Sequence, residues 1–172
     1  NWSKPSSPSN VNIALYHGAI SGCYTGSGWL LEKGEDEMTI FEDHDYAMLG
    51  DIHKPQPLDP DGRVRYAGST IQQNFGEHPL KGFLMWYITD KDTHKVKHVS
   101  LKNVRPFISV TLEKDGTLPK DAVVPKGCRL RLVSNSNISL MQLRKSSEMA
   151  RIKWSPYSVR FLNRGTSSGG SS

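Results

Sequence analysis

Two short apolar runs in this sequence each stop at a glycine-containing turn that carries a histidine or an aspartate. Residues 11–16 lead into His17-Gly18, and residues 46–49 lead into Gly50-Asp51-Ile52-His53. Runs of this length between turn residues predict short buried strands. Polar side chains that follow strand ends lie at the rim of a sheet, where loops converge to build sites. The pattern therefore predicts a sheet with a functional edge.

The rest of the chain predicts further strands and one helix. Strands are expected at residues 63–66, 82–88, 96–101, 107–112, 128–133 and 157–162, with 82–88 and 96–101 forming an antiparallel pair. The prolines and the Asp61-Gly62 pair within residues 55–62 predict a loop with a tight turn. Ser139 and Gln142 match a capping box at the start of a helix near 139–154. Together these elements predict an α+β fold.

Charge divides the chain into two unlike parts. Residues 1–99 carry 9 Lys and Arg against 13 Asp and Glu, whereas residues 100–164 carry 13 against 4. We therefore expect a linker at 1–10, a first domain at 11–104, a basic domain at 105–164 and a flexible tail at 165–172. A dense basic segment indicates a polyanionic partner such as nucleic acid, the alternative being a solvated basic surface.

Membrane insertion is not expected, because no run approaches the roughly 20 apolar residues that a membrane span requires. The N-terminal residues lack the plan of a secretion signal, and Cys23 and Cys128 are interpreted as reduced thiols. The sequence thus predicts an intracellular, cytoplasmic protein, in the nucleoid or in a virus-infected cell, and not a secreted one.

The segment Asp51-Ile52-His53 carries the most specific chemistry. If its backbone is extended, the one-residue spacing places both side chains on the same side. Imidazole and carboxylate are suitable ligands for Mn²⁺, Fe or Zn²⁺, and two metal ions about 3.5–4 Å apart could clamp a phosphodiester. Alone, this pattern is a weak indication of a metal site, the alternative being a turn aspartate and a surface histidine.

Longer strings around this segment resemble those of a known family. They are Tyr46-Ala47-Met48-Leu49-Gly50-Asp51-Ile52-His53-Lys54-Pro55-Gln56, Tyr66-Ala67-Gly68-Ser69-Thr70-Ile71-Gln72-Gln73-Asn74-Phe75-Gly76-Glu77 and Lys81-Gly82-Phe83. The chain resembles SbcD-type (Mre family) DNA repair exonucleases of the calcineurin-like metallophosphoesterase superfamily, most closely the phage and large-virus branch. The resemblance covers the C-terminal portion of that family. It implies the second half of a metallophosphoesterase β-sandwich, of four-layer α/β/β/α type, followed by a small αβ capping domain.

The resemblance also implies a metal site. His17 and the residue at position 51 would bind one metal ion, and His53 would bind the other, with Mn²⁺ as the expected metal. Asp51 departs from the family pattern, in which a histidine stands there, but carboxylate remains a competent ligand. The family's remaining ligands come from Asp-x-His, Gly-Asp-x-x-Asp and Gly-Asn-His-Asp/Glu motifs that do not precede His17. The 172 residues alone are therefore expected to hold half of the site.

The implied reaction is metal-dependent phosphodiester hydrolysis of DNA, in DNA end processing and double-strand break repair. No side chain is expected to act as the nucleophile. Implied partners are DNA, a second copy in a homodimer and an SMC-like ATPase of the SbcC/Rad type. Half a sandwich would leave a sheet face and a strand edge uncovered, which also favours association. The alternatives are hydrolysis of another phosphoester, a non-catalytic DNA-binding or partner-binding fragment, and a catalytically inactive remnant.

Several polar and basic side chains are candidate DNA contacts. They are Lys54, Ser69, Gln72, Arg129, Arg131, Arg144, Lys145 and Arg151. Ser69 and Gln72 have the alternative role of ordering His53. Arg144 has the alternative of pairing with Glu148. Trp86 and Tyr87 are interpreted as core residues.

Overall fold

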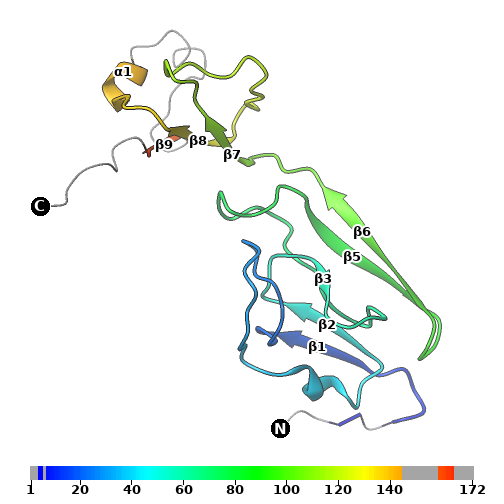
Figure 1. The fold of residues 1–172 in the computed structure, drawn as a ribbon. Helices are drawn as coiled ribbons and strands as arrows, with labels where there is room; N and C mark the ends of the chain where they lie inside the picture. Colours follow the sequence, from blue (N-terminus) through cyan, green and yellow to red (C-terminus); the bar gives the residue numbers. More distant parts are fainter. Residues whose placement is uncertain (1–3, 6, 145–158, 165–172) are drawn as a thin grey trace, which may run out of the picture. The chain divides into compact units, whose positions relative to one another are not determined.

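The computed structural model describes residues 4–5, 7–144 and 159–164. The chain divides into two compact units (Figure 1), of which the first comprises residues 1–72 and 76–103 and the second residues 73–75 and 104–172. Strands dominate the described residues and helices are few and short, so the predicted α+β class is confirmed in a sheet-rich form. None of the described helices is long and apolar enough to cross a membrane.

A four-stranded sheet forms the centre of the first unit. Its strands lie in the order β1 (Ile13–His17), β2 (Tyr46–Gly50), β4 (Val64–Tyr66) and β3 (Gln56–Pro57). Strands β1, β2 and β4 are parallel, and β3 is antiparallel to β4. The carboxyl ends of the parallel strands lie at the same edge of the sheet. His17 and Asp51, two candidate ligands, lie at the ends of β1 and β2 there.

The core of this unit lies on one side of β1 and around β2. It is built from Ala14, Ile20, Cys23, Phe41, Ala47, Leu49, Ile52, Val64 and Tyr66, with Phe41 contributed by the short helix η1 (Met38–Phe41). The alternate residues of β1 face away from this core, and Ile13 and Leu15 are 42% and 74% exposed. One side of β1 is therefore apolar and open in the described residues.

An antiparallel ribbon completes the first unit. It pairs β5 (Lys81–Ile88) with β6 (His94–Leu101), which confirms the predicted antiparallel pair. Trp86 stacks on His94, and both rings contact Tyr46 of β2. The core interpretation of Tyr87 is wrong, because successive strand residues face opposite sides and Tyr87 is 52% exposed.

The second unit contains a parallel sheet in the order β7 (Phe107–Thr111), β8 (Arg129–Ser134) and β9 (Val159–Asn163). Between β8 and β9 lies α1 (Leu140–Arg144), whose Leu143 packs in the core with Leu130 and Leu132. The predicted capping box is confirmed: Ser139 N donates to Gln142 Oε1, and Gln142 N donates to Ser139 Oγ. The remainder of the predicted helix lies outside the described residues.

Candidate functional site

The carboxyl ends of β1 and β2 bring His17 close to the segment that carries Asp51. His17 ends β1 and lies opposite Gly50, the last residue of β2, in the parallel register. The imidazole lies against this glycine, since a Cβ atom at Gly50 would stand 3.0 Å from His17 Cδ2. His17 and Asp51 are both exposed. Two of the predicted metal-binding residues thus lie at the same sheet edge, where an ion from solvent can reach them.

The backbone turns sharply at Asp51. Its φ of 87° makes it the one non-glycine residue with positive φ in the described part of the chain. Aspartate tolerates this left-handed region better than most residues, although the conformation still stores strain. The condition for placing Asp51 and His53 on the same side, an extended backbone, is therefore not met at Asp51. Ile52, which is buried in the core, anchors the turn instead.

Tyr66 of β4 supports the turn that follows β1. Its hydroxyl donates to Gly18 O at 2.7 Å and accepts from Ile20 N at 2.8 Å. The side chain is fully buried, and that burial raises the pKa of Tyr66 above its usual value. The phenol therefore stays neutral and keeps donating over the physiological pH range, which fixes the backbone beside His17.

His53 is held by a carboxylate from a distant part of the chain. Its Nδ1 atom lies 2.9 Å from Glu77 Oε1, and 30% of the His53 side chain is exposed against 3% for Glu77. A carboxylate can only accept, so the contact places a ring proton on Nδ1. The other ring nitrogen, Nε2, is then the atom that can bind a ligand.

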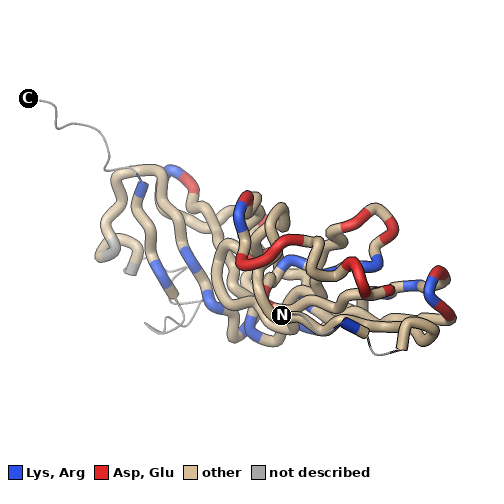
Figure 2. Tube along the Cα trace, turned by 90° about the horizontal axis from the view of Figure 1, so that it is seen from below, with Lys and Arg blue, Asp and Glu red and all other residues tan. Residues whose placement is uncertain are grey.

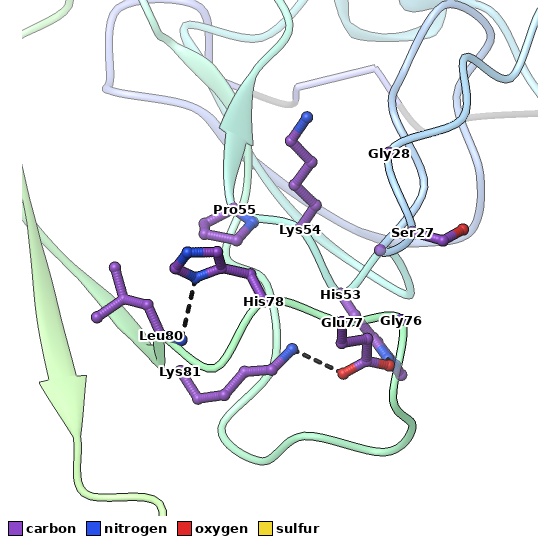
Figure 3. Close-up of a pocket in the computed structure, with 11 residues that line it drawn as sticks. Ser27, Gly28, His53, Lys54, Pro55, Gly76, Glu77, His78, Leu80 and Lys81 are labelled. Carbon is purple, nitrogen blue, oxygen red and sulfur yellow. Dashed lines mark hydrogen bonds and ion pairs between the residues drawn. The ribbon is translucent and has the colours of Figure 1, made fainter. Parts of the chain in front are cut away.

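Lys81 completes the support of Glu77. Its ammonium lies 2.8 Å from Glu77 Oε2 and donates to Ser69 Oγ at 2.8 Å, and its side chain is 3% exposed. Figure 3 shows this ion pair beside His53. Gln72 is also buried and donates to Glu77 O. Ser69 and Gln72 thus contact the two residues that support His53, as the predicted ordering role requires.

A pocket of about 470 Å³ opens beside His53. One wall is the glycine-rich segment 26–28, and Lys54, Glu77 and Lys81 contribute to the other sides. Gly26 permits close packing here, because a Cβ atom at that position would lie 3.3 Å from His53 Cβ. Lys54 points away from the Glu77 carboxylate (Figure 3), and its ammonium lies 4.5 Å from the centre of the Tyr24 ring.

Two of the predicted DNA contacts lie on one face of β8 in the second unit. The guanidinium groups of Arg129 and Arg131 stack on the rings of Phe107 and Phe75, each at 4.7 Å. Arg131 Nε also donates to Ser109 Oγ. Arg144 is the last described residue of α1, and Lys145 and Arg151 lie outside the described residues. Figure 2 shows Lys and Arg along the strands of this unit.

The donor types fit a divalent transition-metal ion, and the Nδ1 contact of His53 is the second contact that metal-binding histidines usually make. Within the described residues, however, no three His, Cys, Asp or Glu side chains gather closely enough to hold a metal ion. Among the described residues, His17, Asp51 and His53 therefore do not complete a metal cage, and their role as ligands stays a prediction.

Comparison with known proteins gives a distant relative. No family model matches the sequence. An uncharacterized protein of Acanthamoeba polyphaga mimivirus is 31% identical over 138 residues, which cover 79% of this chain. The same match covers 10% of the mimivirus protein, so the chain spans about a tenth of the length of that relative.

Sequence reasoning did not select Glu77 or Lys81 as site residues. Both lie within the strings that carry the family resemblance, which was the available signal. Their spacing of four residues did not predict an ion pair, because such a pair is expected on a helix and no helix was predicted here. Here the pair spans the loop that leads into β5.

Proposed function

We propose that this chain contributes part of a two-metal site that hydrolyses DNA phosphodiester bonds, as its resemblance to SbcD-type exonucleases implies. The observation that carries the proposal is the support of the candidate ligands. His17 and Asp51 follow the adjacent ends of β1 and β2, and His53 is oriented by a buried carboxylate. A carboxylate that accepts from the second ring nitrogen is a partner that metal-binding histidines usually have.

His17 and Asp51 would hold one metal ion and His53 the other. When bound, divalent ions such as Mn²⁺ supply Lewis-acid activation of the phosphodiester and of water. The protein's contribution is to position these donors: Tyr66 fixes the backbone after His17, and Glu77 sets the His53 ring. Lys54, Arg129 and Arg131 would neutralise DNA phosphates.

Association with other chains is part of the proposal. Ile13 and Leu15 form an exposed apolar pair on β1, which is the end strand of its described sheet. Such a strand favours pairing or coverage by another segment. A second copy of the chain and an SMC-like ATPase are the proposed partners, on the basis of the family resemblance.

The deciding experiment incubates the full-length gene product with linear duplex DNA and Mn²⁺, with EDTA as the metal-free control. We expect Mn²⁺-dependent cleavage that falls by more than about 100-fold in His17→Ala and His53→Ala, beyond the usual cost of losing an outer-shell partner. His98→Ala, on the β6 strand, is the matched histidine control and should cleave normally. Unchanged cleavage in His53→Ala contradicts the proposal.

One further substrate separates the proposal from its nearest alternative. Hydrolysis of a small chromogenic phosphodiester is measured under the same conditions as DNA cleavage. A higher kcat/KM for DNA supports a nuclease, since the basic second unit would add phosphate contacts only for a polymer. A higher kcat/KM for the small diester would indicate a phosphoesterase with another natural substrate.

A further inference from the structure

The buried ion pair of Glu77 and Lys81 contacts His53, a candidate metal ligand, through the Glu77 carboxylate. Each oxygen of the Glu77 carboxylate has its own partner: Oε1 lies 2.9 Å from His53 Nδ1, and Oε2 lies 2.8 Å from Lys81 Nζ. Figure 3 shows the ion pair of Glu77 and Lys81. The side chains of both residues are 3% exposed. The carboxylate is therefore shared between a buried cation and a partly exposed imidazole.

Stability alone is a poor explanation for this arrangement. Removing two charges from water costs more than their attraction commonly returns, and apolar residues of similar volume often serve as well. The pair does, however, determine the state of the His53 ring. An ionised carboxylate cannot donate, so the neutral imidazole must carry its proton on Nδ1 and present the lone pair of Nε2.

The carboxylate is itself held rigidly. Lys81 Nζ donates to Ser69 Oγ, and Gln72 Nε2 donates to the backbone oxygen of Glu77 at 2.8 Å. Asn103 Nδ2 in turn donates to Gln72 Oε1 at 3.0 Å. Gly26 closes the other side, where a Cβ atom would stand 3.5 Å from Glu77 Cγ. Rotation of the carboxylate away from His53 would break several of these contacts.

We infer that Glu77, backed by Lys81, is a positioning residue that fixes the tautomer and orientation of His53 for metal binding through Nε2. The inference rests on the proposed function, because that function requires a metal ion for His53 to bind. It goes further in assigning roles to two residues outside the ligand set. A carboxylate bonded to a ligating histidine orients the ring and increases its basicity, which raises metal affinity.

The first measurement needs no metal. The tautomer of His53 is determined from the ¹⁵N resonances of its imidazole in the metal-free 172-residue chain, at a pH where the ring is neutral. We expect the Nδ1–H tautomer in the unsubstituted chain. In Glu77→Gln the introduced amide can donate as well as accept, so the Nε2–H tautomer should gain population. Glu113→Gln, at an exposed glutamate of the second unit, should leave the His53 resonances unchanged.

The second measurement is the Mn²⁺ affinity of the full-length gene product. Binding is monitored as the decrease of the electron paramagnetic resonance signal of the free ion. Glu77→Gln should weaken binding by about 10–100-fold, the usual effect of removing an outer-shell partner. Glu77→Asp keeps an acceptor carboxylate and should recover part of the affinity. Because Glu77→Gln leaves Lys81 with a weaker partner, the double variant Glu77→Gln with Lys81→Met provides a form without a buried unpaired charge.

The results distinguish a failure of the positioning role of Glu77 from a failure of the proposed function. An Nε2–H tautomer in the unsubstituted chain overturns the inference. So does unchanged Mn²⁺ affinity in both the single and the double variant, even where the unsubstituted protein binds Mn²⁺ and cleaves DNA. Absence of Mn²⁺ binding by the unsubstituted full-length protein instead overturns the proposed function.

Discussion

His17 and Gly50 lie opposite each other at the ends of two parallel strands, with the imidazole resting on the glycine. A Cβ atom at Gly50 would stand 3.0 Å from His17 Cδ2, which is closer than side chains ordinarily approach. The absence of a side chain at Gly50 therefore lets the ring approach the backbone closely. The register and the glycine together bring this candidate ligand to the end of β2.

Gly50→Ala should displace the His17 ring by a few tenths of an ångström. Because His17 is exposed and can move, we expect a loss of unfolding free energy of about 1 kcal/mol or less, measured by urea denaturation. The free energy of Mn²⁺ binding to the full-length protein should change by more than the free energy of unfolding. In a His17→Ala background the same substitution should have no further effect on affinity, and a full additional loss there would disprove the coupling.

Removing one member of the buried Glu77–Lys81 pair should destabilise the first unit strongly. Lys81→Met leaves a buried carboxylate without its cation, so we expect a loss of about 3–5 kcal/mol in unfolding free energy. Lys95→Met, at an exposed lysine of β6, is the matched control and should change stability by about 0.5 kcal/mol or less. A Lys81→Met loss no larger than the control would contradict the burial of this pair.

Much of the first unit was predictable because its strands are local features. The apolar runs before His17 and Gly50 and the alternating ribbon at 82–101 each lie between turn residues, and each became a strand. The geometry at Asp51 was not predictable in this way. Its positive φ occurs where the chain leaves β2 and buries Ile52, and local spacing does not reveal this turn.

The direct partner of His53 escaped prediction for a related reason. Glu77 lies 24 residues away in the sequence, in a loop that packs closely against Gly26. Periodicity indicates which side chains are buried within an element, but it does not indicate which loops meet. Tyr87 shows the same limit within an element, since its aromatic character suggested burial while its position on the strand left it exposed.

Stability should decline at alkaline pH in a way that depends on Tyr16. Burial and the hydrogen bond that its hydroxyl donates to Asp36 raise the pKa of Tyr16 from its usual value of 10.0 to about 12. The folded state therefore retains a proton that the unfolded state loses, and unfolding free energy should fall between about pH 10 and pH 12. Tyr16→Phe should flatten this fall in denaturation measured across that range, whereas Tyr24→Phe, at an exposed tyrosine, should not.

The open apolar side of β1 should drive association of the isolated chain. Ile13 and Leu15 are the residues exposed there, and an uncovered apolar edge strand favours pairing. Sedimentation velocity should show dimers or larger species whose fraction rises with concentration. Leu15→Lys should shift the population toward monomer, while Val123→Lys, at an equally exposed apolar residue of the second unit, should not. A monomer at all concentrations would contradict this prediction.

DNA binding by the second unit should depend on the charges of Arg129 and Arg131 more than on their stacking. Their guanidinium groups lie over Phe107 and Phe75, and both side chains remain partly exposed, so they can still meet a phosphate. Arg131→Met should weaken DNA binding and reduce the slope of log K against log salt by about 1, as measured by fluorescence anisotropy at several salt concentrations. Arg131→Lys retains the charge but loses the planar stack, so its slope should match that of the unsubstituted chain. Equal slopes in all three proteins would mean that Arg131 serves only to pack against Phe75, and that the basic character of this unit acts through other residues.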